Sequence, residues 1–149
     1  MKVKVIGIGN RIMRDDGVGV LIVESLKEDL GKQQIEVIVG ETDVDYCLSY
    51  IEDGDFLFIV DAATYGLKPG ELTIMKINSG LDNFEKSYSQ HQLSLVKLLN
   101  SYSVKKVSGY VIGIEVLDID FGLELSHELK DNFKEIKNKV YDFIISQGV

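Results

Sequence analysis

The stretch MKVKVIGIGNRIMRDDG, residues 1–17, decides the fold. Its apolar run Val3–Ile8 predicts a buried strand, and the segment Gly17–Leu30 carries apolar side chains at helical spacing. A turn that contains Gly7 and Gly9 joins the strand to the helix. The chain therefore begins with a strand, a glycine-rich turn and a helix, which is how a nucleotide-binding α/β fold begins.

The chemistry of this turn argues against a phosphate ligand. A dinucleotide-binding loop needs a third glycine, and Ile12 occupies that position. The N-terminus of the next helix would receive the pyrophosphate, but Asp15 and Asp16 are expected there. Because two carboxylates repel a phosphate, the turn is better suited to a cation or a water molecule.

Composition indicates one compact domain spanning residues 1–149. With 149 residues, of which 45% are apolar, the chain can bury roughly 70% of its unfolded surface. The lone Cys47 excludes an internal disulfide and fits a reducing compartment. We expect no signal peptide, because Met1 and Lys2 lead directly into the first strand. No apolar run approaches the ~18 residues that span a bilayer.

Charge narrows the range of partners. The chain has 16 basic and 24 acidic residues, a net charge of −8, and no basic stripe stands out. This argues against nucleic acid as a partner. We expect a soluble, cytoplasmic protein, and the sequence gives no prediction of its oligomeric state.

Strands and helices alternate along the chain, which predicts a mostly parallel sheet. The predicted strands are Val3–Ile8, Ile35–Val39, Phe56–Val60, Glu71–Ile77 and Val107–Val116. The predicted helices are Gly17–Leu30, a short helix capped by Asp43, a third that opens at Ser89–Gln92 and carries Leu93–Leu99, and a last one from Ser126 to just before Gly148.

The resulting fold class is α/β, a three-layer sandwich with helices on both faces of a twisted five-stranded sheet of the phosphorylase/hydrolase-like kind. The continuous apolar run Phe56–Val60 is typical of a central strand buried on both sides. The connection from Asp61 to Gly70 is too short for a crossover helix, so Glu71–Ile77 should return antiparallel at the edge of the sheet.

Three polar residues are expected on one rim of this sheet. Ligands of such folds bind beyond the carboxyl ends of the strands. Asp16 follows the first strand, Asp61 directly follows Val60, and His91 opens the third helix. Two carboxylates and an imidazole suit zinc, nickel, iron or manganese with open coordination positions. The helix N-terminus should keep His91 neutral.

Each of these residues also has a structural interpretation. Asp16 could be an acid favoured by the helix dipole, Asp61 could close a turn, and His91 could be an ordinary, partly exposed histidine. Asp15 is expected to cap the first helix. Because Asp16, Asp61 and His91 are all expected on one rim, the functional interpretation is favoured for these three residues.

Other candidate residues have structural interpretations. We expect Cys47 to be a small core residue, His127 to be solvated, and Lys130–Lys139 to form an exposed helix face. The acids after the fifth strand are expected to form a hydrated loop: Glu115, Asp118 and Asp120.

Four motifs in order resemble the nickel-iron hydrogenase maturation endopeptidases, peptidase family M52. They are Gly7–Asn10 with Asp15–Gly19, Val60–Ala62 with Gly66–Gly70, His91–Leu93, and Val111–Ile114 before the final helix. The resemblance spans the whole chain. It implies an enzyme that removes a short C-terminal extension from the precursor of a hydrogenase large subunit after nickel has been inserted.

The resemblance also implies roles for individual residues. The metal-contacting residues of the family fall on Asp16, Asp61 and His91, which are also the implied catalytic residues. The nickel is implied to belong to the substrate, so that the protease reads cofactor insertion by touching the metal. The isolated protein could bind another divalent metal. Hydrolysis could be metal-assisted, or Asp16 or Asp61 could act as a general base in an aspartic-type mechanism.

Two positions depart from the family pattern. The segment after the second strand is often Asp-Gly-Gly-Thr, and here Glu41 precedes Thr42. A proline often precedes the histidine, and here Gln90 does. Two alternatives stay open: a non-catalytic, nickel-dependent hydrogenase assembly factor that uses the same ligands, and a nucleotide- or flavin-binding module of the same fold.

Overall fold

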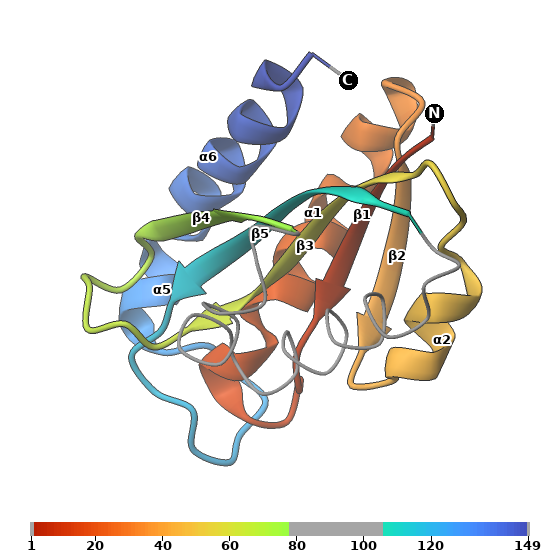
Figure 1. Cartoon of the computed structure of the whole chain (residues 1–149). Coiled ribbons are helices and arrows are strands. Elements are labelled where there is room, and N and C mark those ends of the chain that lie inside the picture. The colour runs from red at the N-terminus through yellow and green to blue at the C-terminus, as the bar shows by residue number, and fades with distance from the viewer. Residues whose placement is uncertain (1, 78–105, 149) are drawn as a thin grey trace.

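The computed structural model describes residues 2–77 and 106–148. In this part of the chain the core is a five-stranded sheet of order β2-β1-β3-β5-β4 (Figure 1). The strands are β1 Val3–Ile8, β2 Glu36–Glu41, β3 Phe56–Ala63, β4 Leu72–Lys76 and β5 Ser108–Glu115. All five overlap the predicted strands, but β3 runs three residues beyond the predicted end at Val60, so Asp61 lies within the strand. The predicted helix that carries Leu93–Leu99 lies outside the described residues.

The sheet is parallel except at one edge. β1 pairs in parallel with β2 and β3, and β3 with β5, while β4 runs antiparallel to β5. Among the described strands, β4 pairs with β5 alone and so forms the edge that the short connection predicted. The carboxyl ends of β1, β2, β3 and β5 therefore share one rim, which lies at the lower side of Figure 1.

Four helices are described: α1 Val18–Lys32, α2 Val44–Ser49, α5 His127–Asp131 and α6 Phe133–Ser146. A short 3-10 helix, η1 Arg14–Gly17, precedes α1. The predicted cap of α2 is confirmed, since the Asp43 carboxylate accepts a hydrogen bond from the Tyr46 N–H. The prediction of a single helix from Ser126 is wrong in one respect, because the structure has two helices there, α5 and α6. The predicted helix breaks at Asn132, whose φ of −96° and ψ of 7° leave the helical region.

Side chains of β3 alternate between two apolar layers. Phe58 and Val60 pack with α1 and α6, whereas Leu57 and Ile59 pack with Cys47 of α2 on the opposite face. Helices therefore cover both faces of the sheet, as predicted. Cys47 is fully buried, which confirms its structural interpretation. Burial raises the pKa of its thiol to about 11.

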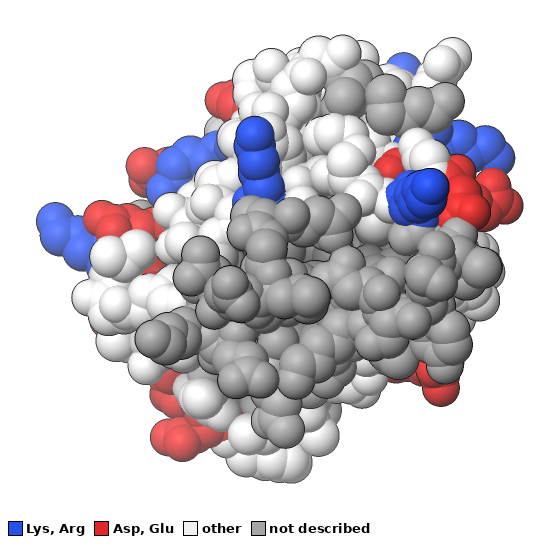
Figure 2. Space-filling view, viewed as in Figure 1, with Lys and Arg blue, Asp and Glu red and all other residues white. Residues whose placement is uncertain are grey.

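Two observations bear on partners. Within residues 2–77 and 106–148, no helix combines the length and the apolar character needed to cross a membrane. On the face shown in Figure 2, the Lys and Arg side chains of the described residues lie in separate places and form no continuous stripe. The described part of this face therefore lacks the clustered positive charge that nucleic acid would require.

One buried ion pair fastens β1 to the start of β3. Lys4 Nζ lies 2.7 Å from Asp55 Oδ2, and the two side chains are 4% and 3% exposed. Lys4 also donates to the Tyr50 carbonyl, and Asp55 accepts from the Glu52 N–H at 2.8 Å. The pair is thus surrounded by hydrogen bonds, the condition under which a buried ion pair is tolerated.

We predict that Lys4→Met destabilises the fold by about 3–5 kcal/mol, because it leaves the Asp55 carboxylate buried without a cation. Urea unfolding followed by circular dichroism measures the loss. Lys32→Met is the matched control, since its partner Glu28 is 3.7 Å away and both side chains are largely exposed. That control should cost less than about 1 kcal/mol. Equal losses in the two variants would contradict the prediction.

Candidate active site

The rim of the sheet brings Asp16 and Asp61 to the same glycine. Asp16 lies in η1, after β1, and Asp61 lies near the end of β3, the neighbour of β1. A methyl group placed on Gly9 would lie 2.1 Å from the Asp16 carbonyl oxygen and 3.4 Å from Asp61 Oδ1. Gly9 therefore fills the narrow space between the backbone of one acid and the carboxylate of the other.

Asp16 is oriented by the glycine-rich turn. Its Oδ2 accepts a hydrogen bond of 2.9 Å from the Asn10 N–H, and the side chain is partly exposed. Its other oxygen, Oδ1, accepts no hydrogen bond from residues 2–77 or 106–148. A phosphate in this turn would compete for the Asn10 N–H, which the carboxylate already binds. The turn therefore presents an oriented carboxylate where a nucleotide-binding fold presents N–H groups.

Asp61 is held more tightly than Asp16. It is 1% exposed, and its Oδ1 accepts a hydrogen bond of 2.7 Å from the Ala62 N–H. Its position depends on Gly19 at the start of α1, because a methyl group there would lie 2.4 Å from the Val60 carbonyl oxygen. Only a glycine lets α1 approach the end of β3 this closely. The sequence Gly17-Val-Gly19 thus contributes to the shape of the site.

The third predicted residue, His91, lies outside the described residues. Within the part of the chain that the structure describes, no three His, Cys, Asp or Glu side chains form a cluster that could hold a metal ion. The assignment of Asp16, Asp61 and His91 as one site stays a prediction.

Glu41, the last residue of β2 and the acid that departs from the family pattern, is bound by Arg11. Arg11 Nε donates to Glu41 Oε1 at 2.5 Å, and its two Nη atoms donate to the Glu24 carboxylate at 2.6 Å each. These hydrogen bonds raise the pKa of Arg11, and the one to Glu24 lowers the pKa of that carboxyl group. Glu41 therefore sits on the same rim with its charge balanced by an arginine.

Asp15 does not cap the first helix, which corrects the prediction made for it. Its carboxylate is fully buried and accepts hydrogen bonds from the N–H groups of Leu117, Asp118 and Ser126, and from the Ser126 hydroxyl. These distances range from 2.7 to 3.0 Å. Asp15 therefore fastens η1 to the segment between β5 and α5.

Two acids at the end of β5 also have structural contacts: Glu115, the last residue of the strand, and Asp118, which follows it. Glu115 is 3% exposed and accepts hydrogen bonds from the N–H groups of Tyr65 and Gly66. Asp118 Oδ2 lies 2.7 Å from Arg14 Nη1. The pKa of Asp118 is lowered, first by the backbone hydrogen bond from Asp120 and then by Arg14. The prediction of a hydrated loop is therefore wrong for Glu115. Nothing in the sequence around Glu115 and Asp118 indicated that these acids would bind the distant Tyr65 and Arg14.

The histidine and most of the lysines predicted to be exposed near the C-terminus are exposed. His127 has a side chain that is 82% exposed, and its Nε2 lies 3.0 Å from Asp131 Oδ2. Lys130, Lys134 and Lys139 are exposed on α5 and α6.

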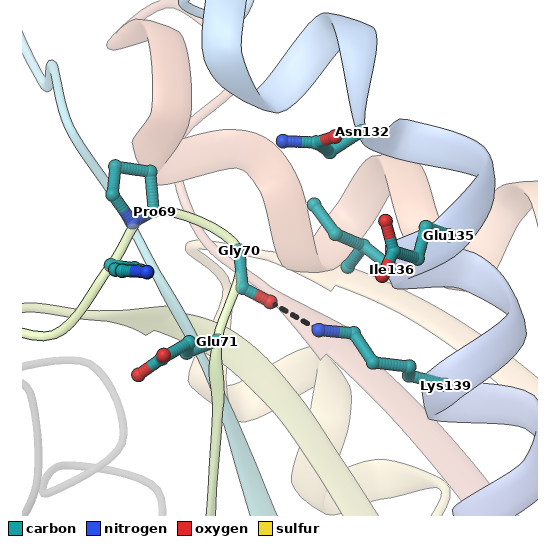
Figure 3. A pocket seen from close by; sticks show the side chains of 8 residues that line it. Pro69, Gly70, Glu71, Asn132, Glu135, Ile136 and Lys139 are labelled. Atoms are coloured by element: carbon teal, nitrogen blue, oxygen red, sulfur yellow. Dashed lines mark hydrogen bonds between the residues drawn. The ribbon is translucent and has the colours of Figure 1, made fainter.

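The loop that contains Pro69 and Gly70 is braced against α6. The loop and α6 line a cavity of about 140 Å³ that is open to solvent (Figure 3). Lys139 Nζ donates to the Gly70 carbonyl at 3.1 Å, as the dashed line in Figure 3 shows. Neither Asp16 nor Asp61 lines this cavity. The brace therefore fixes the loop that follows β3 and lies apart from the two acids.

Solved structures share this fold. The hydrogenase maturating endopeptidase HybD from Escherichia coli superposes with a TM-score of 0.79 at 23% identity, covering 99% of this chain and 94% of that one. The [NiFe] hydrogenase maturation protease HybD from Thermococcus kodakarensis gives a TM-score of 0.74 at 24% identity, covering 96% and 99%. At these identities the likeness establishes the three-layer α/β fold.

Sequence comparison establishes the family. The chain is 27% identical to the hydrogenase expression/formation protein HupD of Thiocapsa roseopersicina, covering 99% of this chain and 70% of HupD. It is 28% identical to HoxM of Azotobacter vinelandii, covering 97% and 73%. The model of the hydrogenase maturation protease family matches residues 20–143. The chain belongs to the hydrogenase maturation protease family, a family of peptidases.

We predict that Asp15→Asn destabilises the protein by about 3 kcal/mol, because an amide group would face buried N–H donors that now bind a carboxylate. Urea unfolding measures the loss. Hydrogen exchange should quicken at the amides of Leu117, Asp118 and Ser126. Asp120→Asn is the control, since that side chain is exposed in the same segment. Unchanged exchange at the three amides would contradict the role given to Asp15.

Proposed function

We propose that this chain is an endopeptidase that removes the C-terminal extension of a nickel-iron hydrogenase large-subunit precursor after nickel insertion. Asp16, Asp61 and His91 contact the substrate's nickel and carry out the cleavage. The observation that carries the proposal is the close approach of the Asp16 backbone and the Asp61 carboxylate to Gly9, in a chain of the hydrogenase maturation protease family.

The two acids differ in a way that suggests separate tasks. Asp16 is partly exposed and its Oδ2 accepts a hydrogen bond from the Asn10 N–H, which suits an oriented ligand that meets a metal on an incoming protein. Asp61 is buried and oriented by the Ala62 N–H, which suits a second ligand held in a fixed position beside the metal that Asp16 contacts. Carboxylate and imidazole ligands together match a divalent transition metal such as nickel.

In the mechanism that we favour, contact with the nickel positions the precursor so that its scissile peptide bond lies beside the acids. A carboxylate takes a proton from water as the water oxygen attacks the peptide carbonyl. The same proton is then delivered to the amide nitrogen as the C–N bond breaks, which releases the extension as an amine and leaves a new carboxyl terminus. A precursor without nickel lacks the contact that positions it. The protease would therefore cut only precursors that already hold their metal.

The test is to mix the purified protein with nickel-loaded and nickel-free precursor and to measure precursor mass before and after. We expect shortening of the nickel-loaded form alone. Asp16→Asn, Asp61→Asn and His91→Ala should each slow the cut by at least about a hundredfold, the scale of a lost acid–base group. Each variant should keep the wild-type circular dichroism spectrum.

Asp29→Asn is the control for these variants, because Asp29 is an exposed acid near the C-terminal end of α1. Wild-type rates in all three site variants would refute the site assignment. A precursor that binds the wild-type protein but keeps its extension would favour a non-catalytic, nickel-dependent assembly factor. Loss of folding in each variant would favour structural roles.

A further inference from the structure

Large apolar side chains point into solvent beside the candidate site. Phe121 and Leu123 are 79% and 78% exposed, and Leu117 and Ile119 alternate with acids in the same segment. Ile12, in the turn that leads to Asp16, is 45% exposed. We call these five side chains the apolar row. A gathering of large apolar side chains in water marks a surface that contacts another molecule.

The apolar row is built on two backbone segments that are bonded to each other. The Gly122 N–H donates to the Ile12 carbonyl at 2.8 Å, and the Arg14 N–H donates to the Gly122 carbonyl at 2.9 Å. Met13 and Gly122 form an isolated parallel bridge. The row is therefore continuous with the turn that carries Asp16, although its parts are about a hundred residues apart in sequence.

Polar contacts hold this segment in its place while its apolar side chains face outward. The buried Asp15 carboxylate binds the N–H groups of Leu117 and Asp118, and Arg14 binds the Asp118 carboxylate and the Glu124 carbonyl. A segment fixed by its backbone loses little conformational freedom when a partner covers its side chains, which favours binding.

The charge pattern selects among possible partners. The acids of the segment alternate with the apolar row: Asp118, Asp120 and Glu124. Arg14 lies 2.7 Å from Asp118 and Lys130 lies 3.8 Å from Glu124, whereas Asp120 forms no ion pair with residues 2–77 or 106–148. A symmetric contact with a second copy of this chain would set Asp120 against the same acid, which is unfavourable. A partner segment that is apolar and basic would satisfy both features.

Resting on the proposed function, we propose that the apolar row is the docking surface for the hydrogenase large-subunit precursor and receives an apolar, basic segment close to the cleavage site. The row binds substrate and takes no part in bond cleavage. Its contacts supply affinity that does not depend on the metal, while contact between Asp16 and the nickel decides whether the docked precursor is cut.

Steady-state cleavage of the nickel-loaded precursor by Phe121→Gln, Leu123→Gln and the double variant tests this proposal. Each single change should raise KM about tenfold or more, because a large apolar side chain is no longer buried on docking. The value of kcat should be unchanged, since the reacting groups are intact. Ile145→Gln, which alters an exposed apolar residue of α6, should leave KM unchanged.

Binding separates this proposal from the proposed function. Titration of labelled precursor should show weaker binding by the double variant, with or without nickel, even if the wild-type protein cuts nothing. Equal KM and equal affinity in wild type and double variant would overturn the docking surface while leaving the peptidase assignment intact. Failure of the wild-type protein to bind the precursor would overturn both.

Self-association is the remaining outcome, and light scattering after size-exclusion chromatography detects it. We expect the same mass for the wild-type protein and the double variant. A wild-type dimer that becomes monomeric in the double variant would overturn the proposal in favour of an interface between two copies.

Discussion

The buried carboxylate of Asp15 is the constraint on which the functional rim depends. It accepts four hydrogen bonds from residues about a hundred positions later in the chain, and it is fully excluded from solvent. A buried carboxylate is costly unless its oxygens are bound, so the segment after β5 has one favourable position relative to η1. That position sets where the backbone of Asp16 and the apolar row lie with respect to each other.

A second constraint is the close approach of backbone to backbone. Gly9 has a φ of 138°, which side-chain-bearing residues rarely adopt, and η1 lies directly over it. Gly19 lets α1 meet the end of β3 in the same way. Without these two glycines the segments that carry Asp16 and Asp61 would be pushed apart. Gly9, which belongs to the turn that resembles a phosphate-binding loop, therefore serves together with Gly19 to bring the backbone segments of two acids close to each other.

The fold could be predicted from sequence because its signals are local. The apolar run of β3, the short connection before β4 and the Asp43 cap each depend on neighbours in the chain. The partners of Asp15 and Glu115 could not be predicted, since an acid that caps its own helix and one that binds a distant loop look the same in sequence. The break at Asn132 was missed because the apolar spacing continues through it. Of the candidate site, sequence predicted the rim that Asp16 and Asp61 share, while His91 lies outside the described residues.

The burial of Cys47 has a practical consequence for anyone who handles this protein. Because the thiolate is the reactive form, a thiol whose pKa is raised to about 11 and which lies between α2 and the sheet should resist alkylating reagents at neutral pH. Modification then requires α2 to detach from the sheet. The rate of labelling of this one sulfur would report how often that helix opens, without any introduced probe.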